Sequence, residues 1–329
     1  MNTPREHIAW NPQIRHDAIF GVMGVPLRFQ TNSAHLFTLA VDAFARFGPP
    51  QREEPLLQMR LFTHPVDTSL PNRAWPVVTR GQGDYYYVTW GPGSTLVADL
   101  ARGYLFGFLV PEAQSWPHLL RDIFLLKPVY TTLTRHDFVP LHVAVLLWRG
   151  RYPLYLVAAP GGDVGVLLYR AVRERWRLVA ERRVMAVRTP RGWHFWGIPW
   201  WLHLPCRARH LFPELEHHTA APQENGEWRL VLDVEDAWPG STEPHAGPGP
   251  LILVREARRG EPDYDWLEPS ELLNQGVFFP PHAPGWLVDS VHDVAAFLAE
   301  QGSYWLDMTD DLEQTFERLD ELGERHWRS

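Results

Sequence analysis

The stretch LYLVAAPGGDVGVLLYRAV, residues 154–172, joins an apolar strand to a short Gly-rich turn and then to a helical segment. Phosphate-binding loops are built in this order, because backbone N–H groups of the turn and of the helix N-terminus face the anion. The Lys and the Ser or Thr that complete such a loop are missing here. The stretch therefore predicts an α/β fold and leaves three interpretations open: an unorthodox nucleotide site, a relic of one, and an ordinary strand-turn-helix.

The composition narrows the class of protein. The chain has 329 residues, 45% hydrophobic and 21% charged, which is ordinary for a folded globular protein. A net charge of -8 and the absence of a basic tail argue against nucleic acid as a partner. No segment reaches the length of a membrane-spanning helix, and the first residues lack the apolar core of a signal peptide. A single cysteine fits a reducing compartment. We therefore expect a cytoplasmic protein that binds neither nucleic acid nor membranes.

The pattern along the chain changes near residue 136. Residues 1–136 predict an α+β module, with a helix capped by Ser33 and a series of short strands that includes Tyr85–Trp90 and Ser94–Asp99. From residue 137 to 329, buried strands alternate with helices. The apolar runs VPLHVAVLLW (139–148) and YPLYLVAAP (152–160) flank the turn RGR and predict a hairpin or two neighbouring strands covered on both faces. We expect two domains with a boundary there.

The second domain resembles a known family in the order of its parts. PLHVAVL, the next strand, the Gly-rich turn, its helix, RWRLVAERRVMAV and GIPWWLHLP follow one another as in the HPr kinase/phosphorylase-like proteins. The closing segment GSYWLDMTDDLEQTFERLDEL is similar to the last strand and helix of that family, so the resemblance spans roughly residues 138–322. It implies a P-loop core of the phosphoenolpyruvate-carboxykinase type and an ancestor that phosphorylated a serine of a protein with ATP.

The loop of that family reads G-x-x-G-x-G-K-[ST] and falls on residues 159–166. Only the second of its three glycines is retained. Gly165 stands where the family has its Lys, and Val166 stands where it has the hydroxyl that binds Mg²⁺. The resemblance thus implies a vestigial phosphate loop made of Ala159, Gly161, Gly162, Asp163, Val164, Gly165 and Val166.

The other family positions are also altered. His142 falls at the strand histidine, and Glu181 with Arg182 falls at the acidic pair that supplies the catalytic carboxylate and a metal contact in active members. Each charge-assisted contact from the loop Lys to phosphate is worth about 1.5 to 3 kcal/mol, and that Lys is gone. Asp163 adds a negative charge to the turn, which we expect to repel a polyphosphate.

We therefore expect a degenerate kinase homologue that has no cofactor and acts by binding a protein or peptide. One alternative is an active ATP-dependent serine kinase with Mg²⁺, in which Arg170 or Arg173 replaces the Lys; Lys127, the only lysine, lies far upstream. Another is a structural subunit of a larger complex. His142 and Glu181 each also fit a purely structural role, as a core histidine and a surface ion pair.

Two segments after the loop are candidates for binding. The run GWHFWGIPWW places Trp193, Trp196, Trp200 and Trp201 close together, and we interpret it as a partner-binding surface or as sheet core. The second segment, LHLPCRARHLFPELEHH, holds several potential zinc ligands without a recognised zinc signature, so no metal site is predicted. These residues are His203, Cys206, His210, His217 and His218.

Overall fold

The computed structural model describes residues 12–50, 54–64, 77–91, 93–159, 163–223, 226–256, 262–276 and 285–328. It is a mixed α/β protein with several sheets. The chain forms two compact units, one comprising Met1–His136 with Pro222–Glu227, the other Asp137–Ala221 with Trp228–Ser329. No helix within the described ranges is both long and apolar enough to cross a membrane.

The first unit is built on a seven-stranded sheet of order β1-β2-β3-β7-β6-β5-β4. Its strands are β1 (His16–Val22), β2 (Val25–Thr31), β3 (Leu57–Thr63), β4 (Val77–Gln82), β5 (Tyr85–Trp90), β6 (Ser94–Asp99) and β7 (Tyr104–Leu109). The hairpin of β1 and β2 turns at Met23 and Gly24, which both have positive φ. This hairpin is not predicted by the sequence analysis, whereas β5 and β6 have the predicted bounds.

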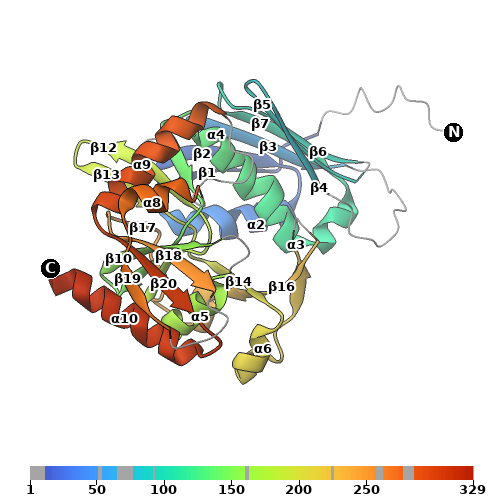
Figure 1. Ribbon diagram of the computed structural model, residues 1–329. Helices are drawn as coiled ribbons and strands as arrows, with labels where there is room; N and C mark the ends of the chain where they lie inside the picture. The colour runs from blue at the N-terminus through green and yellow to red at the C-terminus, as the bar shows by residue number, and fades with distance from the viewer. Residues whose placement is uncertain are drawn as a thin grey trace. The chain divides into compact units, whose positions relative to one another are not determined.

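Helices cover one face of this sheet (Figure 1). Helix α2 (Ala34–Phe44) packs against β1 and β2 and begins as predicted, because the Ser33 hydroxyl accepts the N–H of Leu36 at 3.4 Å. The 3-10 turn η1 (Ala45–Phe47) follows. A second helical stretch consists of η2 (Pro111–Ser115), α3 (Pro117–Leu119), a π-helical segment η3 (Leu120–Leu126) and α4 (Lys127–Leu133).

The second unit is organised around a six-stranded sheet of order β11-β9-β10-β18-β20-β19. These strands are β9 (Ala144–Trp148), β10 (Tyr152–Ala158), β11 (Arg177–Ala180), β18 (Leu251–Glu256), β19 (Tyr264–Trp266) and β20 (Ser303–Met308). Strands β10, β18 and β20 pair in parallel. Strand β9 is antiparallel to both β10 and β11, so β11 runs in the direction of β10. The carboxyl ends of β10, β11, β18 and β20 therefore lie at one edge of the sheet.

Two smaller sheets accompany it. One has the order β17-β13-β12-β8 and the other the order β14-β16-β15. Their strands are β8 (Phe138–Leu141), β12 (Val184–Thr189), β13 (Gly192–Trp196), β17 (His245–Ala246), β14 (Trp201–Pro205), β15 (Ala220–Pro222) and β16 (Trp228–Asp233). The helical segments of this unit are α5 (Gly165–Arg173), α6 (Ala208–Leu211), η4 (Pro213–Leu215), α7 (Val234–Ala237), α8 (Pro269–Asn274), η5 (Gly285–Leu287), α9 (Val288–Glu300) and α10 (Leu312–Arg328).

Alternate residues of the central strands point into two different cores. Leu146 and Trp148 of β9 face a core shared with α5, α10 and the β14–β16 pair. Val145 and Leu147 face a second core shared with α9, β8 and β12. Figure 1 shows α9 and α10 on different sides of the sheet. The central sheet is thus buried on both faces, which explains its continuous apolar runs.

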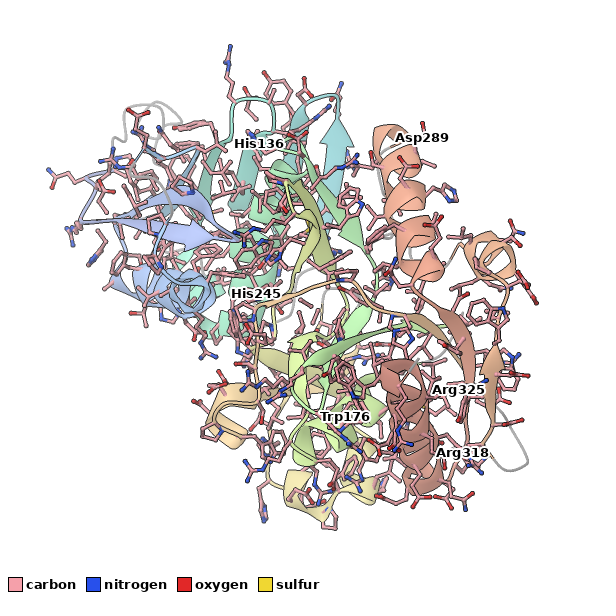
Figure 2. All side chains as sticks on the ribbon, turned by 90° about the vertical axis from the view of Figure 1, so that its left-hand side faces the viewer. His136, Trp176, His245, Asp289, Arg318 and Arg325 are labelled. Atoms are coloured by element: carbon pink, nitrogen blue, oxygen red, sulfur yellow. The ribbon has the colours of Figure 1, made fainter. Side chains whose placement is uncertain are left out.

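Helix α10 is held against β9 by Trp148. The indole Nε1–H donates to Asp320 at 2.6 Å, and a Cβ on Gly323 would lie 2.7 Å from the indole Cδ1. Glycine at 323 therefore lets the helix approach the ring closely. Trp176, labelled in Figure 2, packs its ring against Phe316 of the same helix at 5.2 Å between centroids.

The apolar run 139–148 is divided between two sheets. Its first part is β8, which pairs with β12, and its second part is β9, which forms the predicted hairpin with β10. The division falls at His142 and Val143. Apart from His142 the run is apolar, and its periodicity does not predict the division, because both halves are buried on both faces.

Candidate functional site

Two connections between sheets run side by side at the carboxyl edge of the central sheet. Leu141 pairs with Val184 in one sheet, and Val145 pairs with Ala180 in the other. Residues 142–144 and 181–183 fill the gap between these pairs on neighbouring chain segments. The structure thus brings together His142, Glu181 and Arg182, which the family resemblance singles out from separate parts of the sequence.

Glu181 is buried and holds His203 of β14. Its Oε2 lies 2.6 Å from Nδ1 of His203, and its Oε1 accepts the backbone N–H of the same residue at 3.0 Å. Burial alone would raise the pKa of the Glu181 carboxyl, but the charge of Arg182 and the contacts with His203 outweigh it, and the pKa lies below its usual value. Because the carboxylate is ionised, the proton of this contact belongs to Nδ1 of His203.

His142 is mostly buried and electrically neutral near pH 7. Burial and the nearby charges of Arg183 and Arg182 lower the pKa of its imidazole from 6.5 to about 4. A neutral imidazole keeps one N–H donor and one acceptor. His142 can therefore donate a hydrogen bond at this edge, but it is a weak base.

The segment 159–166, which the family resemblance interprets as a vestigial phosphate loop, leads from β10 into α5. Ala159 still donates its N–H to Val254 of β18 at 2.9 Å, and Gly161 and Gly162 lie outside the described residues. The Oδ1 of Asp163 accepts the N–H of Gly165, the first residue of α5, at 2.8 Å. The Asp163 carboxylate therefore occupies a backbone donor that a phosphate oxygen would use.

Val164, Gly165 and Val166 are buried at the start of α5. Gly165 lies against β14, since a Cβ at this position would come within 3.7 Å of the His203 carbonyl oxygen. The side chain at 166, where an active family member carries its Mg²⁺-binding hydroxyl, is part of the apolar core beside α5. No hydroxyl is offered at this position.

A residue that the sequence analysis overlooked reaches the loop. Arg229 of β16 contacts Oδ2 of Asp163 at 2.7 Å and donates to the carbonyl of His203 at 3.1 Å. The expected repulsion by Asp163 is thus offset by a neighbouring cation. Arg229 lies 66 positions from Asp163 in the chain, so no local pattern pairs them.

The two arginines expected as substitutes for the Lys are engaged on the far part of α5. Arg170 forms ion pairs with Glu313 and Glu174, and Arg173 lies 3.3 Å from Glu214. Both belong to the last turn of the helix, away from the loop at its start. The cation that contacts the loop is therefore Arg229 rather than Arg170 or Arg173.

The four tryptophans divide into two pairs. Trp200 and Trp201 are buried, with 3% and 6% of their surface exposed. Trp193 and Trp196 of β13 are half-buried. Trp196 meets the rings of His194 and of His245, which is labelled in Figure 2, at 5.3 and 5.5 Å between centroids. A partner-binding role is open only to the pair on β13, because the other pair lies within the fold.

Gly197 joins this strand to the site. A Cβ at this position would lie 1.8 Å from the carbonyl oxygen of Val179 in β11, and the Gly197 N–H donates to Pro244 at 2.9 Å. Any larger residue would displace backbone. Glycine at 197 therefore keeps the aromatic strand close to the end of β11, which leads directly into Glu181.

The potential zinc ligands do not converge. His203 is held by Glu181, and the thiol of Cys206 donates to the carbonyl of Trp228 at 3.2 Å. His210 and His217 are exposed, and His218 is half-buried. Within the described ranges, no group of three or more His, Cys, Asp or Glu side chains is arranged to hold a metal ion.

A scan against protein-family models found no match for the chain, and a search of curated proteins found none either.

Proposed function

We propose that this chain is a degenerate relative of the HPr kinase/phosphorylase-like proteins, with a P-loop core in its second unit, that binds a protein or peptide and does not transfer phosphate. The observation that supports it most is the Asp163 carboxylate, which accepts the Gly165 N–H at 2.8 Å and contacts Arg229 at 2.7 Å. A bound phosphate would have to displace this carboxylate from both donors. The donors beside the loop are thus already paired with a carboxylate of the protein itself.

In this proposal Glu181 is poorly suited to act as a general base. Both oxygens of Glu181 are engaged by His203, and the pKa of its carboxyl is lowered after the cost of burial is overcome by Arg182 and His203. A general base works best when its pKa lies near the operating pH, so a carboxylate with a lowered pKa is a poor acceptor for a serine proton. This agrees with a protein that has kept binding and lost catalysis.

Mg-ATP is expected not to bind. At about 5 mM Mg-ATP the melting temperature of the full chain should stay unchanged, because ligand stabilisation follows the ratio of ligand concentration to Kd. The matched variant Asp163→Asn keeps the shape of the side chain and removes its charge, and with it the ion pair with Arg229. We expect this variant alone to gain weak phosphate affinity. Saturable binding of Mg-ATP to the native chain with a Kd below about 1 mM, equivalent to about 4 kcal/mol, would refute the proposal.

The second candidate is an active kinase in which an arginine replaces the loop Lys. Arg229 is a better candidate for this arginine than Arg170 or Arg173, because it contacts Asp163 in the loop. This candidate requires that Mg-ATP binds, that phosphate is transferred to a serine, and that both are lost in Arg229→Gln. Measuring Mg-ATP binding to the native chain and to this variant therefore separates the two candidates.

Protein recognition is assigned to Trp193 and Trp196, since half-buried aromatic side chains offer contact area at low entropic cost. The double variant Trp193→Ala and Trp196→Ala is expected to lose capture of a partner from the native cell extract by about tenfold or more. Trp228→Ala is the matched control, because that side chain is 56% exposed and lies on a different strand. Equal capture by native chain and double variant, with unchanged circular dichroism, would exclude this surface.

A further inference from the structure

The seven-stranded sheet of the first unit has one face turned away from its helices. Trp90 of β5 meets Phe124 of η3 at 6.4 Å between centroids, so Trp90 lies on the helical face. Successive residues of a strand point to opposite faces, which places Tyr87 on the other face. Paired residues of neighbouring strands share a face, so a row of five side chains crosses β4, β5, β6, β7 and β3 there. These are Arg80, Tyr87, Val97, Phe106 and Arg60.

Aromatic rings gather along this row. Tyr85 and Tyr87 on β5 have ring centroids 6.4 Å apart. Phe106 and Phe108 on β7 meet edge to face at 4.9 Å. Tyr85 is 45% exposed, whereas the other three rings are half-buried. We define the aromatic face as these four residues together with Arg60 and Arg80.

The carboxylates of this sheet are already paired. Its seven strands contain two of them, Asp17 and Asp99. Asp17 lies 2.6 Å from the guanidinium group of Arg28. Asp99 accepts the backbone N–H of Arg102 at 3.1 Å and lies 3.6 Å from its guanidinium group. Each carboxylate thus has an arginine of its own, and neither arginine belongs to the aromatic face.

The aromatic face adds two more arginines. Arg60 donates its Nε–H to the side-chain oxygen of Gln30 at 2.8 Å, and it acts electrostatically on Asp17, whose first partner is Arg28. Arg80 is exposed and forms no ion pair with any residue that the structure describes. Because neighbouring strands lie about 4.8 Å apart, the two arginines stand about 19 Å apart across the sheet. The row therefore carries a positive charge at each end and aromatic rings between them.

The negative charge of the chain is concentrated after residue 136. Residues 1–136 hold 12 Lys and Arg and 10 Asp and Glu, whereas residues 137–329 hold 19 and 29. The expectation that this protein does not bind nucleic acid rests on the net charge of -8 for the whole chain. That net charge gives no argument against an anionic ligand on the sheet of the first unit.

We propose that the aromatic face binds single-stranded nucleic acid. Bases that are not paired stack on aromatic side chains, and arginines contact the phosphates that join them. An open sheet face with aromatic side chains can stack roughly two or three bases. A neutral sugar could also stack on such rings but would leave the arginines at both ends of the row unused. The proposal concerns the first unit and goes beyond protein recognition by the second.

The test is a fluorescence-anisotropy titration of the full chain with labelled oligouridine RNA and oligothymidine DNA of about eight nucleotides. We expect saturable binding that Tyr85→Ala weakens about fivefold or more, because the stacking of one base is lost. In Arg80→Gln the slope of log Kd against log salt concentration should fall by about 0.7, because one phosphate contact is removed. Both side chains are exposed, so these variants keep the fold.

The two oligomers distinguish the possible sources of the strand. Tighter binding of the RNA would show that the 2′-hydroxyl is recognised, and the reverse order would identify DNA. Trp266→Ala and Arg188→Gln are the matched controls, because both side chains are exposed on strands of the second unit, and they should bind as the native chain does.

Four results would overturn the proposal. The first two are no saturable binding of either oligomer, and binding by Tyr85→Ala and Arg80→Gln that equals binding by the controls. The third is binding of duplex DNA as tightly as of single strands, since the rings would then contribute nothing. The fourth is binding of a polyglutamate peptide with the same affinity, which would make the aromatic face a site for acidic peptides.

Discussion

Replacing Trp148 with alanine is expected to lower the free energy of unfolding of the second unit by about 3 to 5 kcal/mol. The side chain is 1% exposed and belongs to the core between β9, α5 and α10. Its removal leaves a cavity that α10 cannot fill, because the helix approaches the indole through Gly323, which has no side chain. It also deprives Asp320 of its 2.6 Å hydrogen bond.

Chemical denaturation followed by circular dichroism measures this loss. The matched control is Trp327→Ala, since Trp327 is 54% exposed and its ring contacts Tyr152, at a tilted angle, from the end of the same helix. An aromatic pair of this kind is worth about 0.5 to 1.5 kcal/mol, so the control should lose no more than that. A loss for Trp148→Ala that is no larger than for the control would show that α10 is not anchored by this side chain.

The stability of the second unit is expected to fall by about 3 kcal/mol between pH 6.5 and pH 4 because of His142. Burial, with the charges of Arg183 and Arg182, lowers the pKa of its imidazole in the folded chain to about 4, against 6.5 when unfolded. In this window the unfolded chain binds a proton that the folded chain does not bind. Falling pH therefore favours unfolding, and the effect is complete below pH 4.

The measurement compares the native chain with His142→Gln at a series of pH values. In a plot of the free energy of unfolding against pH, the variant should lose the part of the slope that His142 contributes. His194 and His326, whose pKa values burial also lowers, act equally in both proteins. The contribution of Glu181 is lost only as pH falls below 4.5, because the pKa of its carboxyl is lowered. His217→Gln, at an exposed position, is the control and should keep the native slope. Equal slopes for the native chain and His142→Gln would contradict the buried, neutral histidine.

Local features of the fold follow from local sequence. Ser33 caps α2 as predicted, because a cap needs only a hydroxyl three residues before the N–H that it accepts. The bounds of β5 and β6 agree with the prediction for the same reason, since each is a short run of strand-forming residues between turn residues. The β1–β2 hairpin is missed because its turn is Met23-Gly24, which lacks the Asn or Asp typical of such turns.

The sequence predicts only some of the site residues that lie far apart in the chain and meet in the fold. The resemblance selects His142, Glu181 and Arg182, and the fold places all three at one sheet edge. It gives no sign that His203 would hold Glu181, since the sequence analysis treats this histidine only as a potential metal ligand. The sequence analysis leaves core and surface open for Trp200 and Trp201, because a run of tryptophans has no period that separates buried from exposed rings, and the structure buries both.

The sequence by itself determined local elements such as the Ser33-capped helix α2 and strands β5 and β6, and it showed that the Lys and hydroxyl of a phosphate loop are missing. Both depend on residues within a few positions of one another. Only the tertiary structure decided what fills the loop: Arg229, from a strand 66 positions away, meets Asp163, whose carboxylate takes the first N–H of α5. An ion pair between separate strands depends on how sheets pack, and a linear pattern of residue types does not encode that distance.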